Sequence, residues 1–156
     1  LRKADMNNAI DAKILSNKLS GLKWLSCLHP NNPEKETSQL LEVINIIKND
    51  NRTKSIVTDY QFIPVILSLY DYSTSQVWFI NHVVSHEKES KYFKSYKNFF
   101  IKQLKENNIE VAYTIKPLWS GNDVFEKGLS KNCFKKIKKT EILDIYILQD
   151  CDELKN

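Results

Sequence analysis

The side chains best suited to chemistry in this sequence lie where predicted strands end. Six of them form the candidate ligand site: Asp59, Tyr60, His82, His86, Trp119 and Asp123. Carboxylates and imidazoles are groups that proteins use for proton transfer. In open parallel sheets, ligands bind beyond the carboxyl ends of the strands, so these residues, with Lys116 and Ser120, would gather at one sheet edge. The alternative is that Asp59 caps a helix and Trp119 covers the core, and we assign no catalytic residue.

Two of these side chains have a spacing that suits a metal ion on a helix. His82 and His86 stand at positions i and i+4, but the residues around His82 are strand-like, and in a strand this spacing separates the side chains. Glu87 or Glu89 would have to supply a third ligand. We therefore predict an ordinary strand-end histidine and a loop histidine, with no bound metal and no cofactor.

The elements that must position this site are centred on residues 54–84. Residues 55–58 are rich in branched side chains typical of a strand, and Asp59 offers an N-cap for a helix with apolar residues at helical spacing. Residues 77–84 form a second apolar run and predict another strand. Strand, helix and strand make a βαβ unit. The predicted fold is α/β and three-layered, a mostly parallel, Rossmann-like sheet of about four to five strands with flanking helices.

The rest of the chain supplies further helices and strands. Helices are predicted over 4–19, 33–48, 91–107 and 124–129, strands over 110–116 and 140–148, and weaker extended segments over 22–28 and 133–137. Asn32 and Pro33 are a typical helix start, and Pro64 must lie in the first turn of its helix. The predicted organisation is a connector helix (1–20), a single α/β domain (21–150) and a frayed tail (151–156).

Composition excludes two function classes. The chain has only three glycines, Gly21, Gly121 and Gly128, and no two lie close enough for a phosphate-cradling loop. This argues against a nucleotide-binding Rossmann domain. The net charge is +4, but Arg2 and Arg52 are the only arginines, so we predict no nucleic-acid partner. The densest positive charge lies between Lys127 and Lys139. This segment is either a solvated face or a surface that docks on anionic lipid.

The cysteines and the chain start bear on the cellular compartment. Cys27, Cys133 and Cys151 are odd in number and form no CxxC pair, so they are expected to be buried free thiols. No window of 18 apolar residues occurs, and no signal peptide is visible. Because the chain begins at Leu1 and enters a polar helix, we expect an excised piece of a longer protein, with any membrane segment upstream.

Four stretches together resemble a known class of membrane protein. They are HPNNPEKE (29–36), SIVTDYQFIPVIL (55–67), KYFKSYKNFFIKQLKENNIE (91–110) and YTIKPLW (113–119). They are similar to the C-terminal soluble part of bacterial GT-C-type glycosyltransferases, which use polyprenyl-phosphate sugars. The resemblance covers roughly residues 20–150.

The resemblance implies a non-catalytic periplasmic domain of a membrane glycosyltransferase. Its partners would be an upstream transmembrane segment of the same chain and a glycan or polyprenyl-phosphate sugar, which it would help to place. Catalytic acids of that class lie in a membrane-part loop absent here, so none is carried onto this sequence. The rival hypothesis is a free-standing, cytoplasmic α/β enzyme with Asp59, His82 and Asp123 as acid–base candidates at the strand ends.

Overall fold

The fold is that of a computed structural model, which describes residues 6–26, 28–69, 88–116 and 124–155. The chain divides into two compact units: Leu1–Asp50 with Phe62–Tyr70, here the helical unit, and Asn51–Gln61 with Asp71–Asn156, here the sheet unit. Within the described residues, no helix is long and apolar enough to cross a membrane. The predicted boundaries at residues 20 and 150 stay a prediction, and the predicted strand 77–84 lies outside the described residues.

The helical unit contains short N-terminal turns and two helices. Its elements are β1 (Ile10–Asp11), the 3-10 turns η1 (Ala12–Ile14) and η2 (Asn17–Leu19), β2 (Lys23–Trp24), α1 (Pro33–Lys48) and α2 (Phe62–Leu67). β1 and β2 form an antiparallel pair. The predicted start of α1 is confirmed, because Asn32 is its N-cap and accepts a hydrogen bond from the backbone of Lys35 at 3.3 Å. Pro64 is the third residue of α2, as its missing N–H requires.

The prediction of one helix over residues 4–19 is wrong for the described residues. Asp11 accepts a hydrogen bond from the backbone N–H of Lys13, and Ser16 accepts one from Lys18. Each short polar side chain therefore begins its own turn, which competes with a continuous helix. Gly21 has φ +84°, so it turns the chain from η2 toward β2 at a position that a residue with a Cβ would strain.

The sheet unit is built on a four-stranded mixed sheet. Its elements are β3 (Lys54–Thr58), α3 (Phe93–Glu106), β4 (Val111–Ile115), α4 (Val124–Gly128), the 3-10 turn η3 (Lys131–Cys133), β5 (Phe134–Lys138) and β6 (Leu143–Leu148). The strand order is β3-β4-β6-β5. β3 and β4 are parallel, whereas β4–β6 and β5–β6 are antiparallel. The predicted α/β class is confirmed, but the mostly parallel, Rossmann-like sheet is not.

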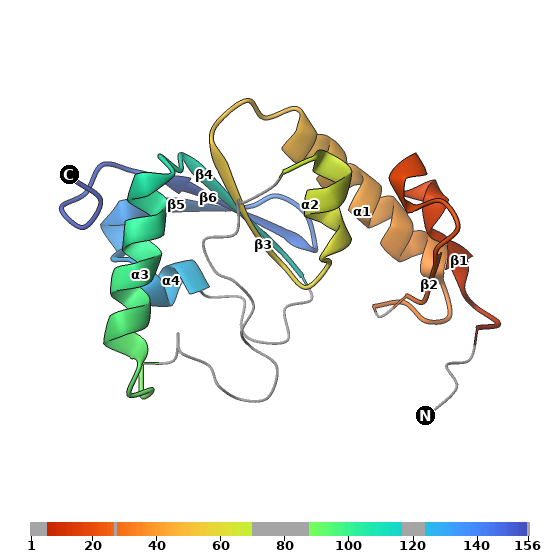
Figure 1. Cartoon of the computed structure of the whole chain (residues 1–156), viewed down its shortest axis with the longest axis horizontal. Coiled ribbons are helices and arrows are strands. Elements are labelled where there is room, and N and C mark those ends of the chain that lie inside the picture. The colour runs from red at the N-terminus through yellow and green to blue at the C-terminus, as the bar shows by residue number, and fades with distance from the viewer. Residues whose placement is uncertain (1–5, 27, 70–87, 117–123, 156) are drawn as a thin grey trace. The chain divides into compact units, whose positions relative to one another are not determined.

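Helices α3 and α4 cover one face of this sheet. Figure 1 shows them side by side next to the strands, and their apolar side chains form one buried cluster with the facing strand residues. A row of rings crosses the cluster: Phe100 lies 5.2 Å from Phe125, Phe125 lies 4.9 Å from Tyr146, and Phe134 lies 5.4 Å from Tyr146. This row joins α3, α4, β6 and β5. Phe99 on α3 and Tyr92 at its N-cap lie outside this row and are each 51% exposed.

A disulfide joins the two ends of the β5–β6 hairpin. Cys133 and Cys151 are bonded, with a Cα–Cα distance of 5.1 Å. The prediction of free thiols is therefore wrong for these two residues, because spacing in sequence does not reveal that β5 and β6 pair. Residues 151–155, which we expected to fray, are also bound through Glu153, which accepts hydrogen bonds from Lys97 at 2.8 Å and from Ser130.

Packing between α3 and α4 predicts a strong effect of one small substitution. A Cβ added at Gly128 would come within 2.8 Å of the Phe100 ring, closer than van der Waals contact allows. We expect Gly128→Ala to lower the free energy of unfolding by about 1–3 kcal/mol, because a close-packed core resists added volume. Urea unfolding measures this loss. Phe100→Leu in the same chain should recover part of it, and strictly additive effects of the two changes would contradict the contact.

Candidate functional site

A charged cluster lies beside the carboxyl end of β4 in the sheet unit. We call it the Asp144 cluster, and its members are Thr114, Lys116, Glu126, Lys136, Asp144 and Tyr146. β4 and β6 supply the central residues, β5 supplies Lys136, and α4 supplies Glu126. Four separate elements therefore meet at one point of the fold.

The strand register explains this meeting. Thr114 on β4 lies directly opposite Asp144 on β6, and Lys136 on β5 lies opposite Tyr146. Residues at alternate positions point to the same face, and Tyr146 belongs to the buried cluster under α3 and α4. Asp144 and Lys136 therefore lie on the face that these helices cover. Lys116 follows the last residue of β4 and donates its backbone N–H to Ile142 at 2.8 Å, which continues the strand pairing.

Asp144 is a buried carboxylate that faces two ammonium groups. Its side chain is 2% exposed, and Oδ2 lies 3.2 Å from Nζ of Lys116 and 3.4 Å from Nζ of Lys136. A buried charge requires close opposite charges because the protein interior solvates it poorly. Both lysines are partly exposed, at 28% and 37% of the side chain. Their ammonium groups therefore connect the buried carboxylate with the surface.

Glu126 and Tyr146 complete the cluster around Lys136. The ammonium of Lys136 donates to Oε1 of Glu126 at 2.6 Å, and the Tyr146 hydroxyl donates to the same oxygen at 3.1 Å. Burial raises the pKa of Tyr146 to about 12, and Glu126 adds to the rise against the opposing effect of Lys136. Burial alone would lower the pKa of Lys136, but Glu126, Tyr146 and Asp144 raise it on balance. Lys136 is thus a cation at neutral pH rather than a nucleophilic amine.

Two buried oxygen atoms of the cluster have no hydrogen-bond partner in the part of the chain that the structure describes. They are Oδ1 of Asp144 and Oγ1 of Thr114, and both residues are 2% exposed. An ionised carboxylate oxygen can only accept hydrogen bonds, whereas a hydroxyl can donate or accept. Since nearly all buried polar groups in proteins are paired, these two oxygens are the atoms of the cluster that could take a further hydrogen bond.

The residues predicted for the ligand site have different outcomes. Asp59 directly follows β3, at the same edge of the parallel pair as Lys116. Tyr60 is buried, with its backbone N–H donated to Thr58 Oγ1 at 3.0 Å. The other four candidates lie outside the described residues: His82, His86, Trp119 and Asp123. The candidate set therefore stays a prediction, while Lys116, which was expected at this edge, contacts Asp144.

Sequence reasoning missed Asp144, although a signal was present. Asp144 is the one charged residue in the six residues of β6, LDIYIL. A carboxylate inside such an apolar strand is rarely buried without a partner. The partners were not recognisable, because Lys136 lies in a lysine-rich segment and its pairing depends on the register of the hairpin. The neighbouring lysines Lys135 and Lys138 are exposed on the edge strand, where lysine also discourages strand-to-strand aggregation.

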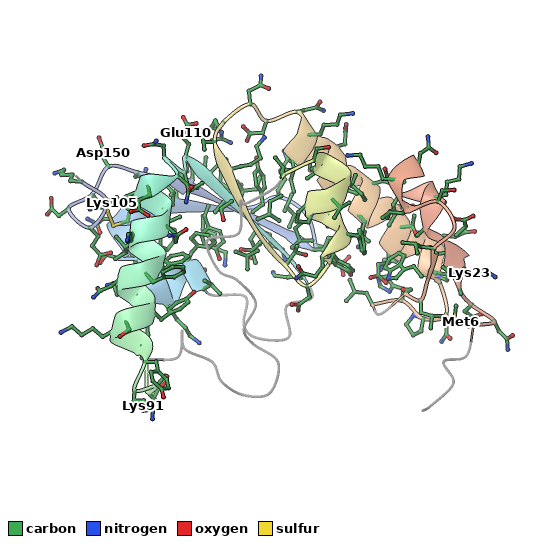
Figure 2. All side chains as sticks on the ribbon, in the orientation of Figure 1. Met6, Lys23, Lys91, Lys105, Glu110 and Asp150 are labelled. Atoms are coloured by element: carbon green, nitrogen blue, oxygen red, sulfur yellow. A yellow bond between two sulfur atoms is a disulfide. The ribbon has the colours of Figure 1, made fainter. Side chains whose placement is uncertain are left out.

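A hollow lies at the end of the sheet opposite to the Asp144 cluster. It has a volume of about 360 Å³ and is lined by Arg52, Lys105, Glu110 and Asp150 among others. Figure 2 shows Lys105, Glu110 and Asp150 at this end of the sheet unit. Its charged groups are of both signs, and Glu110 accepts a hydrogen bond from the backbone of Thr53 at 2.7 Å. The described residues contain no group of three or more His, Cys, Asp or Glu side chains placed to hold a metal ion.

Comparison with known proteins yields no relative for this chain. No protein-family model matches it, and neither the curated proteins nor the solved structures give a significant match.

The raised pKa values in the cluster predict a loss of stability at alkaline pH. Tyr146 and Lys136 hold their protons to higher pH in the folded than in the unfolded chain. Their contribution to the unfolding free energy is thus fully present below about pH 10 and is lost as the pH rises through the folded pKa values. Urea unfolding between pH 8 and pH 11.5 measures this loss.

The variant Tyr146→Phe should flatten this alkaline decline, because it removes one of the two titrating groups. It should also lower stability at pH 8 by about 1 kcal/mol through the lost hydrogen bond to Glu126. The control is Tyr92→Phe, which removes the hydroxyl of a tyrosine that is 51% exposed and lies outside the cluster. Equal declines in Tyr146→Phe and the control would contradict the assigned role of Tyr146.

Proposed function

We propose that the sheet unit binds a small ligand that carries both a phosphate and a hydroxyl group, at the Asp144 cluster. The observation that carries the proposal is the buried Oδ1 of Asp144, which lacks a hydrogen-bond partner within the described residues while Oδ2 faces two lysines. A ligand hydroxyl would donate to Oδ1. The phosphate would lie against the partly exposed ammonium groups of Lys116 and Lys136, which have donors to spare.

The energetics of the cluster support a binding role. Replacing a buried ion pair with apolar residues is often neutral or stabilising, so such a pair is weak support for a purely structural purpose. The cluster also adjoins the carboxyl ends of β3 and β4, which are parallel. Ligand sites collect at this edge of α/β sheets. The burial of Asp144 and the position of the cluster at this edge both favour ligand binding.

Two larger roles are compatible with this ligand chemistry. In the first, the chain is the soluble, periplasmic domain of a GT-C-type membrane glycosyltransferase, and the cluster takes the phosphate and sugar hydroxyls of a polyprenyl-phosphate sugar. In the second, the chain is a free-standing α/β enzyme, and Asp144 accepts a proton from a substrate hydroxyl. A mostly parallel, Rossmann-like sheet is likewise only proposed, since the described strands form one parallel pair and two antiparallel pairs.

A ligand panel tests the proposal. The melting temperature of the purified chain is measured with each of five compounds: inorganic phosphate, glucose, glucose 1-phosphate, geranyl phosphate and a nucleoside diphosphate. A ligand at a hundred times its dissociation constant stabilises the native state by about 2.7 kcal/mol. We expect glucose 1-phosphate to stabilise more than phosphate or glucose alone. Added stabilisation by geranyl phosphate favours the glycosyltransferase role, and a response to the nucleotide alone favours the enzyme.

Variants show whether the response comes from the Asp144 cluster. Lys116→Met should weaken binding of glucose 1-phosphate about tenfold, a change of about 1.4 kcal/mol, because it removes the more buried of the two ammonium groups while Lys136 still pairs with Asp144. Lys102→Met, which removes an exposed lysine paired with Glu106 on α3, is the matched control. Equal affinities in the two variants, or no response to any phosphate ligand, would overturn the proposal.

A further inference from the structure

The disulfide lies where the β5–β6 hairpin would otherwise open. Cys133 directly precedes β5, and Cys151 follows β6 by three residues. The last paired residues before the bond are Phe134 and Leu148. Gln149 then donates its backbone N–H to the carbonyl of Cys133 at 2.9 Å. The bond therefore closes the hairpin at the end opposite to the turn between its strands.

Besides the disulfide, strand β5 is held in register by its pairing with β6 and by the contact of Phe134 with Tyr146. Among the described strands it pairs only with β6, at the edge of the sheet. Its lysines Lys135, Lys136 and Lys138 are exposed, and only Phe134 and Ile137 are half-buried. Such a strand buries little apolar surface, and a slip by one residue would turn Lys136 to the other face. Lys136 would then leave Asp144 and Glu126.

The segment after β6 strengthens the same connection. Cys151 is 4% exposed and Cys133 is 1% exposed, so the bond is buried. Two residues further on, Glu153 binds Lys97 of α3 and both the backbone and the hydroxyl of Ser130. The disulfide and Glu153 together fix the end of the chain to α3 and to η3, which leads into β5.

We propose that the Cys133–Cys151 disulfide positions Lys136 in the Asp144 cluster and so places ligand binding there under redox control. This inference rests on the proposed function for its binding part, while its structural part stands on the hairpin alone. The oxidised chain holds Lys136 beside Asp144, and the reduced chain releases it. A chain that depends on such a bond functions in an oxidising compartment, where disulfides persist.

The redox step is an ordinary thiol–disulfide exchange. A thiolate of an external dithiol attacks one sulfur of the bond, the other sulfur leaves as a thiolate, and a mixed disulfide forms. The second thiol of the dithiol then displaces the protein sulfur. Two electrons pass to the protein, which ends with two cysteine thiols, and the dithiol becomes a disulfide. Since both sulfurs are buried, the end of the chain must open locally before the first attack.

The test compares the oxidised chain, the dithiothreitol-reduced chain and the Cys133→Ser/Cys151→Ser variant. Amide hydrogen exchange of β5 reports the hairpin, and the nuclear Overhauser effect between Lys136 and the Tyr146 ring, whose centroid lies 5.3 Å from Nζ, reports the lysine position. Calorimetry with glucose 1-phosphate reports binding. Cys27→Ser, which keeps the bond, is the control and should match the oxidised chain in all three measurements.

We expect about tenfold faster exchange of the β5 amides, loss of the Lys136–Tyr146 signal and about tenfold weaker binding after reduction. Unchanged exchange and an unchanged Lys136–Tyr146 signal would overturn the inference. If the oxidised chain binds no phosphate ligand, the proposed function fails on its own. The exchange and Overhauser measurements then still decide whether the disulfide positions Lys136.

Discussion

The structure of the sheet unit depends on how one buried carboxylate is neutralised. Asp144 is 2% exposed and faces the ammonium groups of Lys116 and Lys136. A buried carboxylate without such partners would be strongly destabilising, so β4, β5 and β6 must stay in one register for this charge to be tolerated. The pairing therefore specifies the arrangement of strands more than it stabilises them. Oδ1 of Asp144 stays buried without a hydrogen-bond partner among the described residues.

The apolar core and the charged cluster share residues, which explains how the fold holds the site. Tyr146 stacks on Phe125 at 4.9 Å and also donates its hydroxyl to Glu126. Phe125 and Glu126 are neighbours on α4, so packing of the first fixes the second. Phe100 in turn packs on Phe125 at 5.2 Å from α3. A substitution in the apolar core would therefore also displace the charged side chains of the Asp144 cluster.

Local sequence signals predicted most elements but not their pairing. Asn32 and Pro33 predicted the start of α1, and the apolar runs predicted β3, β4 and β6, because caps and periodicity depend on neighbouring residues only. The prediction of one helix over residues 4–19 was wrong, because Asp11 begins a turn of its own. Strand direction, the Cys133–Cys151 bond and the partners of Asp144 depend on contacts between distant segments, which a single sequence does not reveal.

The most direct test of the central claim is a nuclear magnetic resonance titration of the side-chain carboxylate of Asp144. The chain is labelled with ¹³C at aspartate, and glucose 1-phosphate is added at pH 7. We expect a saturable shift of the Asp144 carboxylate signal, while the signal of the exposed Asp152, which pairs with Lys155, stays unchanged. A silent Asp144 with a shift at Asp150, in the hollow at the other end of the sheet, would contradict it.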